Sequence, residues 1–375
     1  MSASLGAYMA IEFFNTNISP EAVKQASKTL KSTWVSEGRL VKKFEADLTK
    51  RLGLKNPVAL NSCTSALHLG LAVSGVGPGD EVILPAQTFI ATGLAVLMQS
   101  AKPVFADIQP DTGNIDPVAI RKKITRRTKA IIPVHWGGYP CDMDEINALA
   151  KEFKLSVVED AAHALGAVYK NKPIGAISRF TAFSFQAIKH LTTADGGALC
   201  CMSPVDFRKA MARRWFGIDR EHSQLSILGE RQYNVKEVGY KYHMNDLNAA
   251  IGLGNLFDFR KNLKHRQEIA RLYRENLSNT VGLKLLNYAS NRKSACWLFT
   301  ILVEDRLNFI KKLSEHGIPA SVVHQRIDRN IVFGGICLDL VNQKIFNEQQ
   351  VSIPLHNKLT DDQINKIVKV IKQGW

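Results

Sequence analysis

Apolar strand-like segments alternate with helix-like segments up to about residue 200, and this alternation limits the possible folds more than any other feature. The strand-like segments lie at 58–60, 81–84, 103–105, 128–134, 157–158, 181–185 and 198–202. Strands that alternate with helices form a mainly parallel sheet with helices on both faces. At 375 residues, 45% of them apolar, the chain is long enough for one large domain and a smaller one.

Lys189 lies in a tight connection between the last two predicted strands. The segment 181–185 (TAFSF) suits a buried strand, and 198–202 (ALCCM) is apolar again. Between them, 192–197 (TTADGG) favours turns. A lysine in this place is either a solvated loop residue, as most lysines are, or a reactive amine held in a site.

Asp160 follows another apolar strand within the segment 155–166 (LSVVEDAAHALG). In an open parallel sheet, ligands bind outside the carboxyl ends of the strands. An aspartate there can pair with the protonated nitrogen of a bound pyridine ring. The alternative is that Asp160 caps a helix that begins at Ala161.

The segment 58–69 (VALNSCTSALHL) runs from an apolar strand into a helix-like stretch. Hydroxyl and free N–H groups at a helix N-terminus form an anion site, although simple capping by Ser62 or Thr64 is the alternative. A phosphate site, an aspartate and a lysine, each at a strand end, are what pyridoxal 5'-phosphate (PLP) needs. The phosphate is bound, the ring nitrogen is charge-paired, and the aldehyde forms a Schiff base with the lysine.

Six motifs occur in a fixed order: NSCTSALHL (61–69), LPAQTFIATG (84–93), PVHWGGYPCDMD (133–144), VVEDAAHALGA (157–167), SFQAIKHLTTADGGAL (184–199) and GYKYHMNDLNAAIGL (239–253). By these motifs the chain resembles, over residues 15–375, the DegT/DnrJ/EryC1/StrS family of PLP-dependent sugar aminotransferases. The resemblance implies an α/β fold, the PLP-transferase fold type I. Its large domain holds a mixed, mainly parallel seven-stranded sheet between helices, and its smaller C-terminal domain is α+β. We expect these domains at 15–250 and 251–375, the second starting in a long helix that begins at Asn245 and bends near Gly252 or Gly254.

The resemblance also implies roles for single residues. Lys189 matches the lysine that forms the Schiff base and later moves a proton between substrate and cofactor. Asp160 matches the partner of the ring nitrogen, and His163 a position beside the cofactor's 3-hydroxyl group. Phe89 matches an aromatic residue that lies against the ring, with a place in the core as the alternative. The expected phosphate-binding residues are Thr64, Ser65 and Ser184. Cys63 stands where the family usually has glycine.

Relatives often carry a GYNYR motif whose asparagine reaches the cofactor phosphate of the partner subunit, and this chain has GYKYH at 239–243. The resemblance thus implies a homodimer with shared sites. Lys241 is expected to face the partner's site, with an ordinary surface lysine as the alternative. We expect substrate contacts from His135, at a strand end, and from Arg326, because arginine suits bidentate contacts with phosphate or carboxylate. For His135 the alternative is a core position.

The function that the resemblance implies is transfer of an amino group, with L-glutamate as donor, to a keto-deoxy sugar linked to a nucleotide diphosphate. The product would be an amino sugar for a glycan or polysaccharide. Two alternatives keep the cofactor: amination of a keto-cyclitol, and sugar dehydration, although relatives that dehydrate carry histidine at the position of Lys189. A third is a catalytically silent, basic binding protein, because a fold does not fix a function.

The composition narrows the possible partners. A net charge of +15 favours anionic partners, and its basic residues cluster at 121–129, 208–220 and 260–274. No nucleic-acid module signature is present, so most of this charge is expected on solvated surface and no nucleic-acid partner is expected.

No apolar run reaches 18 residues and no leader pattern precedes residue 14, so neither a membrane partner nor secretion is expected. Six scattered cysteines without metal-ligand spacing indicate reduced thiols in the cytoplasm and no metal.

Overall fold

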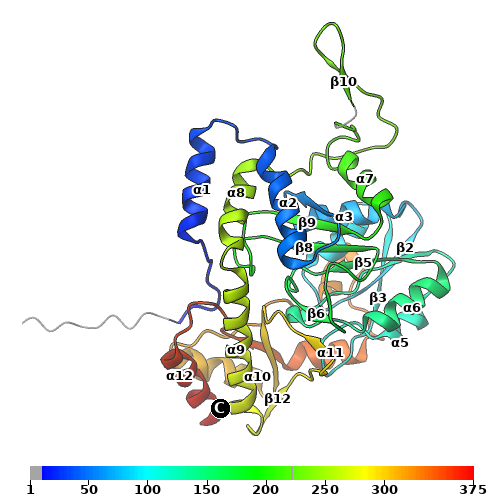
Figure 1. Cartoon of the computed structure of the whole chain (residues 1–375). Coiled ribbons are helices and arrows are strands. Elements are labelled where there is room, and N and C mark those ends of the chain that lie inside the picture. The colour runs from blue at the N-terminus through cyan, green and yellow to red at the C-terminus, as the bar shows by residue number, and fades with distance from the viewer. Residues whose placement is uncertain (1–10, 221–222) are drawn as a thin grey trace, which may run out of the picture.

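The computed structural model describes residues 11–220 and 223–375. Most of the N-terminal segment in which the sequence shows no leader pattern therefore lies outside the described residues. A seven-stranded sheet forms its centre (Figure 1). In order across the sheet the strands are β1 (Pro57–Leu60), β9 (Gly197–Cys201), β8 (Phe180–Ser184), β5 (Ser156–Asp160), β4 (Thr128–Ile131), β2 (Glu81–Pro85) and β3 (Lys102–Ala106). Five of them pair in parallel, and β9 runs antiparallel to both its neighbours. The predicted α/β fold with a mainly parallel sheet is confirmed.

Two apolar cores lie on the two faces of this sheet. Along β2, Val82 and Leu84 join one core and Ile83 the other, as the two-residue period of a strand requires. The first core is covered by α3 (Cys63–Val73), α4 (Ile90–Leu97) and α7 (Pro204–Arg213). The second is covered by α2 (Arg39–Leu52), α5 (Pro117–Lys123), α6 (Met143–Phe153) and α8 (Asp246–Leu256). No helix in the described ranges is long and apolar enough to cross a membrane.

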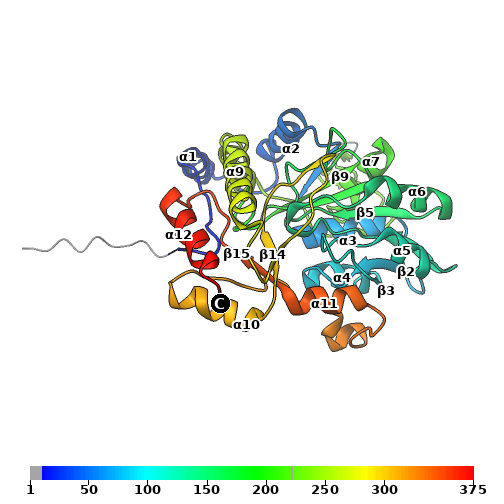
Figure 2. The ribbon, with the colours of Figure 1, turned by 90° about the horizontal axis from the view of Figure 1, so that it is seen from below.

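The C-terminal part of the chain builds a second, smaller layer. Its antiparallel sheet has the order β12 (Leu283–Leu285), β14 (Phe299–Val303), β15 (Gln350–Ile353). Figure 2 shows β14 and β15 beside the C-terminal helices. These helices are α9 (Phe259–Leu277), α10 (Arg306–Glu315), α11 (Val341–Gln349) and α12 (Asp361–Lys372). Short 3-10 helices η2 (Ile327–Arg329) and η3 (Ile331–Phe333) lie between α10 and α11, and another, η1 (Trp136–Gly138), lies between β4 and α6.

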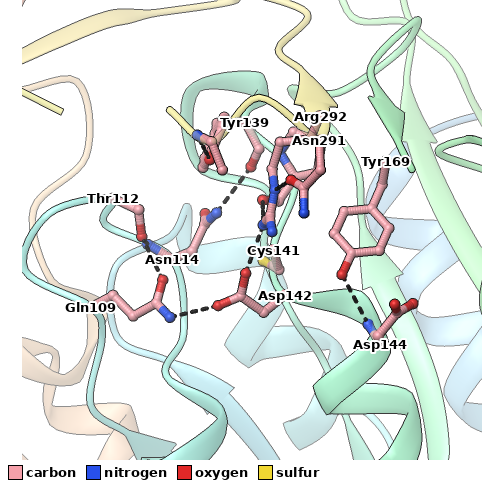
Figure 3. A network of polar contacts seen from close by, with 12 residues as sticks. Gln109, Thr112, Asn114, Tyr139, Cys141, Asp142, Asp144, Tyr169, Asn291 and Arg292 are labelled. Atoms are coloured by element: carbon pink, nitrogen blue, oxygen red, sulfur yellow. Dashed lines mark hydrogen bonds and ion pairs between the residues drawn. The ribbon is translucent and has the colours of Figure 1, made fainter. Parts of the chain in front are cut away.

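The remaining strands are short. β6 (Val168–Tyr169) pairs with β7 (Lys172–Pro173) and with β13 (Arg292–Lys293), and this pairing ties the C-terminal layer to the large sheet. Arg292 strengthens the junction, because it donates hydrogen bonds to Asp142 at 2.7 Å and to the carbonyl of Pro140 at 3.1 Å (Figure 3). A projecting hairpin is formed by β10 (Gln224–Leu225) and β11 (Arg231–Gln232) (Figure 1).

The single bent helix expected after Asn245 is two helices, α8 and α9, separated at Phe257–Asp258. The prediction of a bend at Gly252 or Gly254 was wrong, because these glycines serve close packing. A Cβ atom at Gly252 would lie 2.8 Å from the Phe44 ring on α2. Since α8 packs on α1 (Pro20–Lys31) and α2, whereas α9 packs on α12, we propose that the domains divide at this break.

Gly254→Ala is expected to lower the free energy of unfolding by about 1–3 kcal/mol, measured by urea denaturation. A Cβ atom there would lie 2.3 Å from the backbone nitrogen and Cα of Ala22 on α1, and a backbone cannot rotate away. This clash outweighs the gain of about 1 kcal/mol that alanine brings to a helix. Gly77→Ala is the control, because a Cβ atom at Gly77 meets nothing within 4 Å. Equal stability of both variants would contradict the packing argument.

Candidate active site

The loop between β8 and β9 holds Lys189, as predicted from the sequence. Its ends are fixed by hydrogen bonds from the Phe185 amide to the Gly196 carbonyl (2.8 Å) and from the Thr193 amide to the Phe185 carbonyl (2.9 Å). The side chain of Lys189 is half-buried, with Nζ 3.4 Å from the centroid of the Trp297 ring. Burial lowers the pKa of Lys189 to about 7, although the negative charge of Asp160 opposes the shift. A neutral amine, which is the nucleophilic form, is therefore available near neutral pH.

Asp160 is the last residue of β5 and its carboxylate is buried. One oxygen accepts a hydrogen bond from the Thr92 hydroxyl at 2.7 Å, and the other accepts from the Ala162 amide at 3.1 Å. No helix follows at Ala161, so the helix-capping alternative was wrong. Burial raises the pKa of Asp160, whereas these two hydrogen bonds and the charge of Lys189 lower it. A cationic ring nitrogen beside it would stabilise the ionised form further.

Thr92→Val is expected to move the acidic limb of the pH profile of kcat/KM upward by roughly one pH unit. The Thr92 hydroxyl lowers the pKa of Asp160, so its removal raises that pKa, and the ionised carboxylate is then lost at a higher pH. Thr92→Ser, which keeps the hydroxyl, is the control and should retain the original limb. A limb that stays in place in the valine variant would show that Asp160 does not control activity.

His163 lies on the turn after Asp160, and its ring stacks on Trp297 with centroids 3.8 Å apart. Burial, and secondarily the charge of Lys189, hold the pKa of His163 well below its usual range, so the ring is neutral. Its Nδ1 is buried and has no hydrogen-bond partner within the described ranges. A buried polar atom without a partner is costly, and a ligand hydroxyl group at this place would satisfy it.

The N-terminus of α3 lies at the expected phosphate position. Ser62 caps this helix by accepting from the Ser65 amide at 3.0 Å, and the Ser65 hydroxyl donates to Asn61 at 2.6 Å. In the described part of the chain, the amides of Cys63 and Thr64 have no hydrogen-bond partner and remain available for an anion. Cys63 has no left-handed backbone angle, so glycine is not required there.

Two other residues shape the phosphate position. Gly197, at the start of β9, must be glycine, because a Cβ atom would lie 2.5 Å from the carbonyl carbon of Ser62. Ser184 is buried at the end of β8, and its hydroxyl accepts from the Gln186 amide at 3.4 Å. Both strand ends therefore meet the same edge of the sheet as α3.

The residues present fit PLP. Asp160 would hold the ring nitrogen, His163 would face the ring hydroxyl, and the first turn of α3 would hold the phosphate. The family model described as the DegT/DnrJ/EryC1/StrS aminotransferase family matches residues 16–372. The chain belongs to this family. It is a PLP-dependent transaminase of the sugar aminotransferase type, so the alternative of a catalytically silent binding protein is not retained.

Several known proteins resemble this aminotransferase over nearly their whole length. The spore coat polysaccharide biosynthesis protein SpsC of Bacillus subtilis is 37% identical over 95% of this chain and 94% of its own. The UDP-4-amino-4-deoxy-L-arabinose–oxoglutarate aminotransferase of Shewanella sediminis is 32% identical over 95% and 96%. The structure of the sugar aminotransferase CalS13 from Micromonospora echinospora matches with a TM-score of 0.93 and 32% identity, covering 97% of this chain and all of its own. The structure of Spr1654 of Streptococcus pneumoniae in its PLP form matches with a TM-score of 0.88 and 30% identity, covering 97% of this chain and 98% of its own.

The two residues expected to contact substrate are buried and paired with other residues of the aminotransferase. His135 is fully buried, with Nε2 2.8 Å from a Glu159 oxygen and Nδ1 accepting from the Cys141 amide at 3.1 Å, so neither ring nitrogen is free. Arg326 is buried and forms a bidentate pair with Asp328 at 2.7 and 2.5 Å. Both side chains are thus engaged in contacts within the protein, and a substrate role for either stays a prediction.

Phe89 lies at the entrance of the site rather than in the core, with 54% of its surface exposed. Its ring centroid is 5.2 Å from that of His324, a residue that the sequence did not single out. Trp297 was missed as well, although it touches both Lys189 and His163. Burial lowers the pKa of His324 to about 4, so this ring is neutral and adds to an aromatic wall around the amine.

Proposed function

We propose that this aminotransferase moves an amino group from L-glutamate to a keto-deoxy sugar linked to a nucleotide diphosphate. The product is an amino sugar for glycan or polysaccharide biosynthesis. The observation that carries the proposal is the Lys189 amine, depressed in pKa to about 7, on the same sheet edge as Asp160 and the α3 N-terminus. This is the arrangement that amino-group transfer with PLP requires.

The names of the relatives and the charge of the chain support the substrate class. One relative is named for a UDP-linked amino sugar and for oxoglutarate, the keto acid that corresponds to glutamate. Another is named for polysaccharide biosynthesis. The net charge of +15 favours a polyanionic substrate such as a nucleotide diphosphate. All six cysteines are free, which is consistent with our proposal of a cytoplasmic location.

The residues of the chain divide the chemistry between them. Bound PLP supplies an electron sink for the carbon that loses its proton. Lys189, whose pKa is lowered to about 7, is partly neutral near pH 7, and in this form it would take the proton from the donor and deliver it to the cofactor. Asp160 would pair with the ring nitrogen of the bound cofactor, and the neutral His163, with its unpartnered Nδ1, would face the ring hydroxyl group. The half-buried wall of Phe89 and His324 restricts water at the reacting atoms.

We propose that a second copy of the chain completes the site. Lys241 is exposed, and in the described ranges its side chain makes no hydrogen bond or ion pair, while its carbonyl accepts from Asn61 Nδ2 at 3.3 Å. The residue is thus anchored by its backbone beside the phosphate loop, and its amine is free to reach a partner subunit. Lys241 of one protomer would then bind the phosphate or the substrate of its partner.

The test separates the two half-reactions. Purified protein with PLP is mixed with L-glutamate, and the formation of 2-oxoglutarate and the loss of the visible absorbance band are measured. The protein, now carrying the cofactor in its aminated form, is then offered keto-deoxy sugars linked to UDP, GDP or dTDP, with a free keto-cyclitol as control. We expect the visible absorbance band to recover with at least one nucleotide-linked sugar and not with the cyclitol. Recovery with the cyclitol alone would overturn the proposed substrate, and release of water without amination would favour the dehydratase alternative.

A further inference from the structure

We propose that Trp297 is a positioning residue that holds the amine of Lys189 whenever this amine is not bonded to the cofactor. The inference rests on the proposed role of Lys189. In a transaminase the lysine is released when the amino donor takes its place, and it must then stay within reach of the proton that it moves. A long, flexible side chain does not stay in one place without a contact.

The structure places the Lys189 amine over the Trp297 ring. Lys189 Nζ lies 3.4 Å from the centroid of the Trp297 ring, well within the range of a cation–π interaction. Indole is the strongest of the aromatic partners for an ammonium group. In the described ranges Lys189 Nζ has no hydrogen bond or ion pair, so the ring is the one specific contact of this charge.

The ring itself is fixed in place. Trp297 is 1% exposed, and its Nε1 donates to the carbonyl of Ile188, the residue before the lysine, at 3.1 Å. His163 stacks on the indole at 3.8 Å with an angle of 19° between the planes, and Phe14 stacks at 5.3 Å with an angle of 21°. The ring is therefore held to the same loop that carries the lysine.

An aromatic ring suits this task better than a carboxylate. It attracts the ammonium group but offers no atom that shares the proton, so the amine can release the proton and turn back to the cofactor. The ionisable groups that interact with Lys189 are Asp160, Cys63, His163, His190 and His324. Burial lowers the pKa of all three histidines, so near neutral pH they add no positive charge.

The test measures the protonation of the Lys189 amine directly, in the protein without cofactor. Modification of Lys189 by trinitrobenzenesulfonate is followed against pH by mass spectrometry of its peptide. Trp297→Leu removes the attraction for the ammonium form, so we expect the midpoint to fall by about half to one pH unit. In Trp297→Phe, which keeps an aromatic ring, the midpoint should fall by less. Trp136→Phe is the control, because Trp136 is buried near His163 and no contact of its ring with Lys189 is present.

Two further measurements test the role of Trp297 even if the leucine variant does not fold or shows no shift. Replacing all tryptophans with 5-fluorotryptophan weakens the attraction of the Trp297 ring for a cation and hardly changes the shape of the ring. The labelling midpoint of Lys189 should therefore fall in this protein too, even if the leucine variant does not fold. With L-glutamate, the leucine variant should also show a first half-reaction about 5–10-fold slower, at a nearly unchanged KM.

The outcomes distinguish this inference from the proposed function. Unchanged midpoints in the leucine and fluorinated proteins would overturn the role of Trp297 while leaving the transaminase intact. Failure of the PLP absorbance band to shift when PLP is mixed with the wild-type protein would instead overturn the role of Lys189. In that case the labelling midpoint would still be measurable, because it needs no cofactor.

Discussion

Replacing Lys189 with alanine is expected to reduce kcat for amino-group transfer by at least about 10⁴-fold, because the change removes both a nucleophile and a proton carrier. The measurement is 2-oxoglutarate formed from L-glutamate in one turnover. The variant should fold normally, since burial of this amine opposes the charged form and no hydrogen bond of its Nζ is lost. The visible band that depends on a bond between lysine and cofactor should also disappear.

Lys151→Ala is the matched control for this experiment. Lys151 is an exposed residue in the last turn of α6, so its loss should leave both the band and the rate unchanged. If Lys189→Ala retained more than about one hundredth of the activity, another amine would have to carry the proton. The assignment of Lys189 as the catalytic residue would then be wrong.

Asp160→Asn should lower kcat by about 10²–10³-fold, the range found when a preorganised electrostatic partner is removed. The amide has the size of the carboxylate and can accept from the Thr92 hydroxyl, which now donates at 2.7 Å. It carries no charge, however, and cannot keep a proton on a ring nitrogen. We expect cofactor binding to weaken and the first half-reaction to slow, both followed by absorbance.

Asp144→Asn controls for the loss of one negative charge, since Asp144 is an exposed carboxylate paired with Lys170 on the surface. Full activity of Asp160→Asn would mean that Asp160 does not face the ring nitrogen. If Asp160→Asn lost activity and its folded fraction also fell, Asp160 would instead have a structural role. Circular dichroism and urea denaturation of both variants separate these cases.

The strands of the large sheet and the loops at their ends were predictable from local sequence. A run such as TAFSF at 181–185 has the composition of a buried strand wherever it lies, and the structure places β8 at Phe180–Ser184. Because parallel strands end at one edge of a sheet, the strand-end positions of Asp160 and the 61–65 segment already implied a common site.

The rest of the site depends on contacts between residues far apart in the chain. Trp297 and Ile188, which share a hydrogen bond, are separated by 109 residues, and Thr92 and Asp160 by 68. No local pattern marks such a pair. The open question about His135 had the same origin: it ends a strand as a site residue would, and only Glu159, 24 residues away, shows that its ring is used internally. The glycines of α8 resembled hinges until Phe44 and Ala22 were seen against them.

The stacking of Phe14 on Trp297 has a consequence for how the enzyme is made in the cell. Phe14 leaves the ribosome long before its partner Trp297, and Glu12, whose carbonyl lies 3.0 Å from Nε2 of His356, leaves long before that histidine. Domains generally fold in the order in which they are synthesised. The strands that flank Lys189 and end at Asp160 can therefore pair while the chain is still growing, but the pocket acquires its last wall only after residue 297 has been synthesised. A ribosome-bound chain that stops before residue 297 should hold a formed sheet and an amine still open to water.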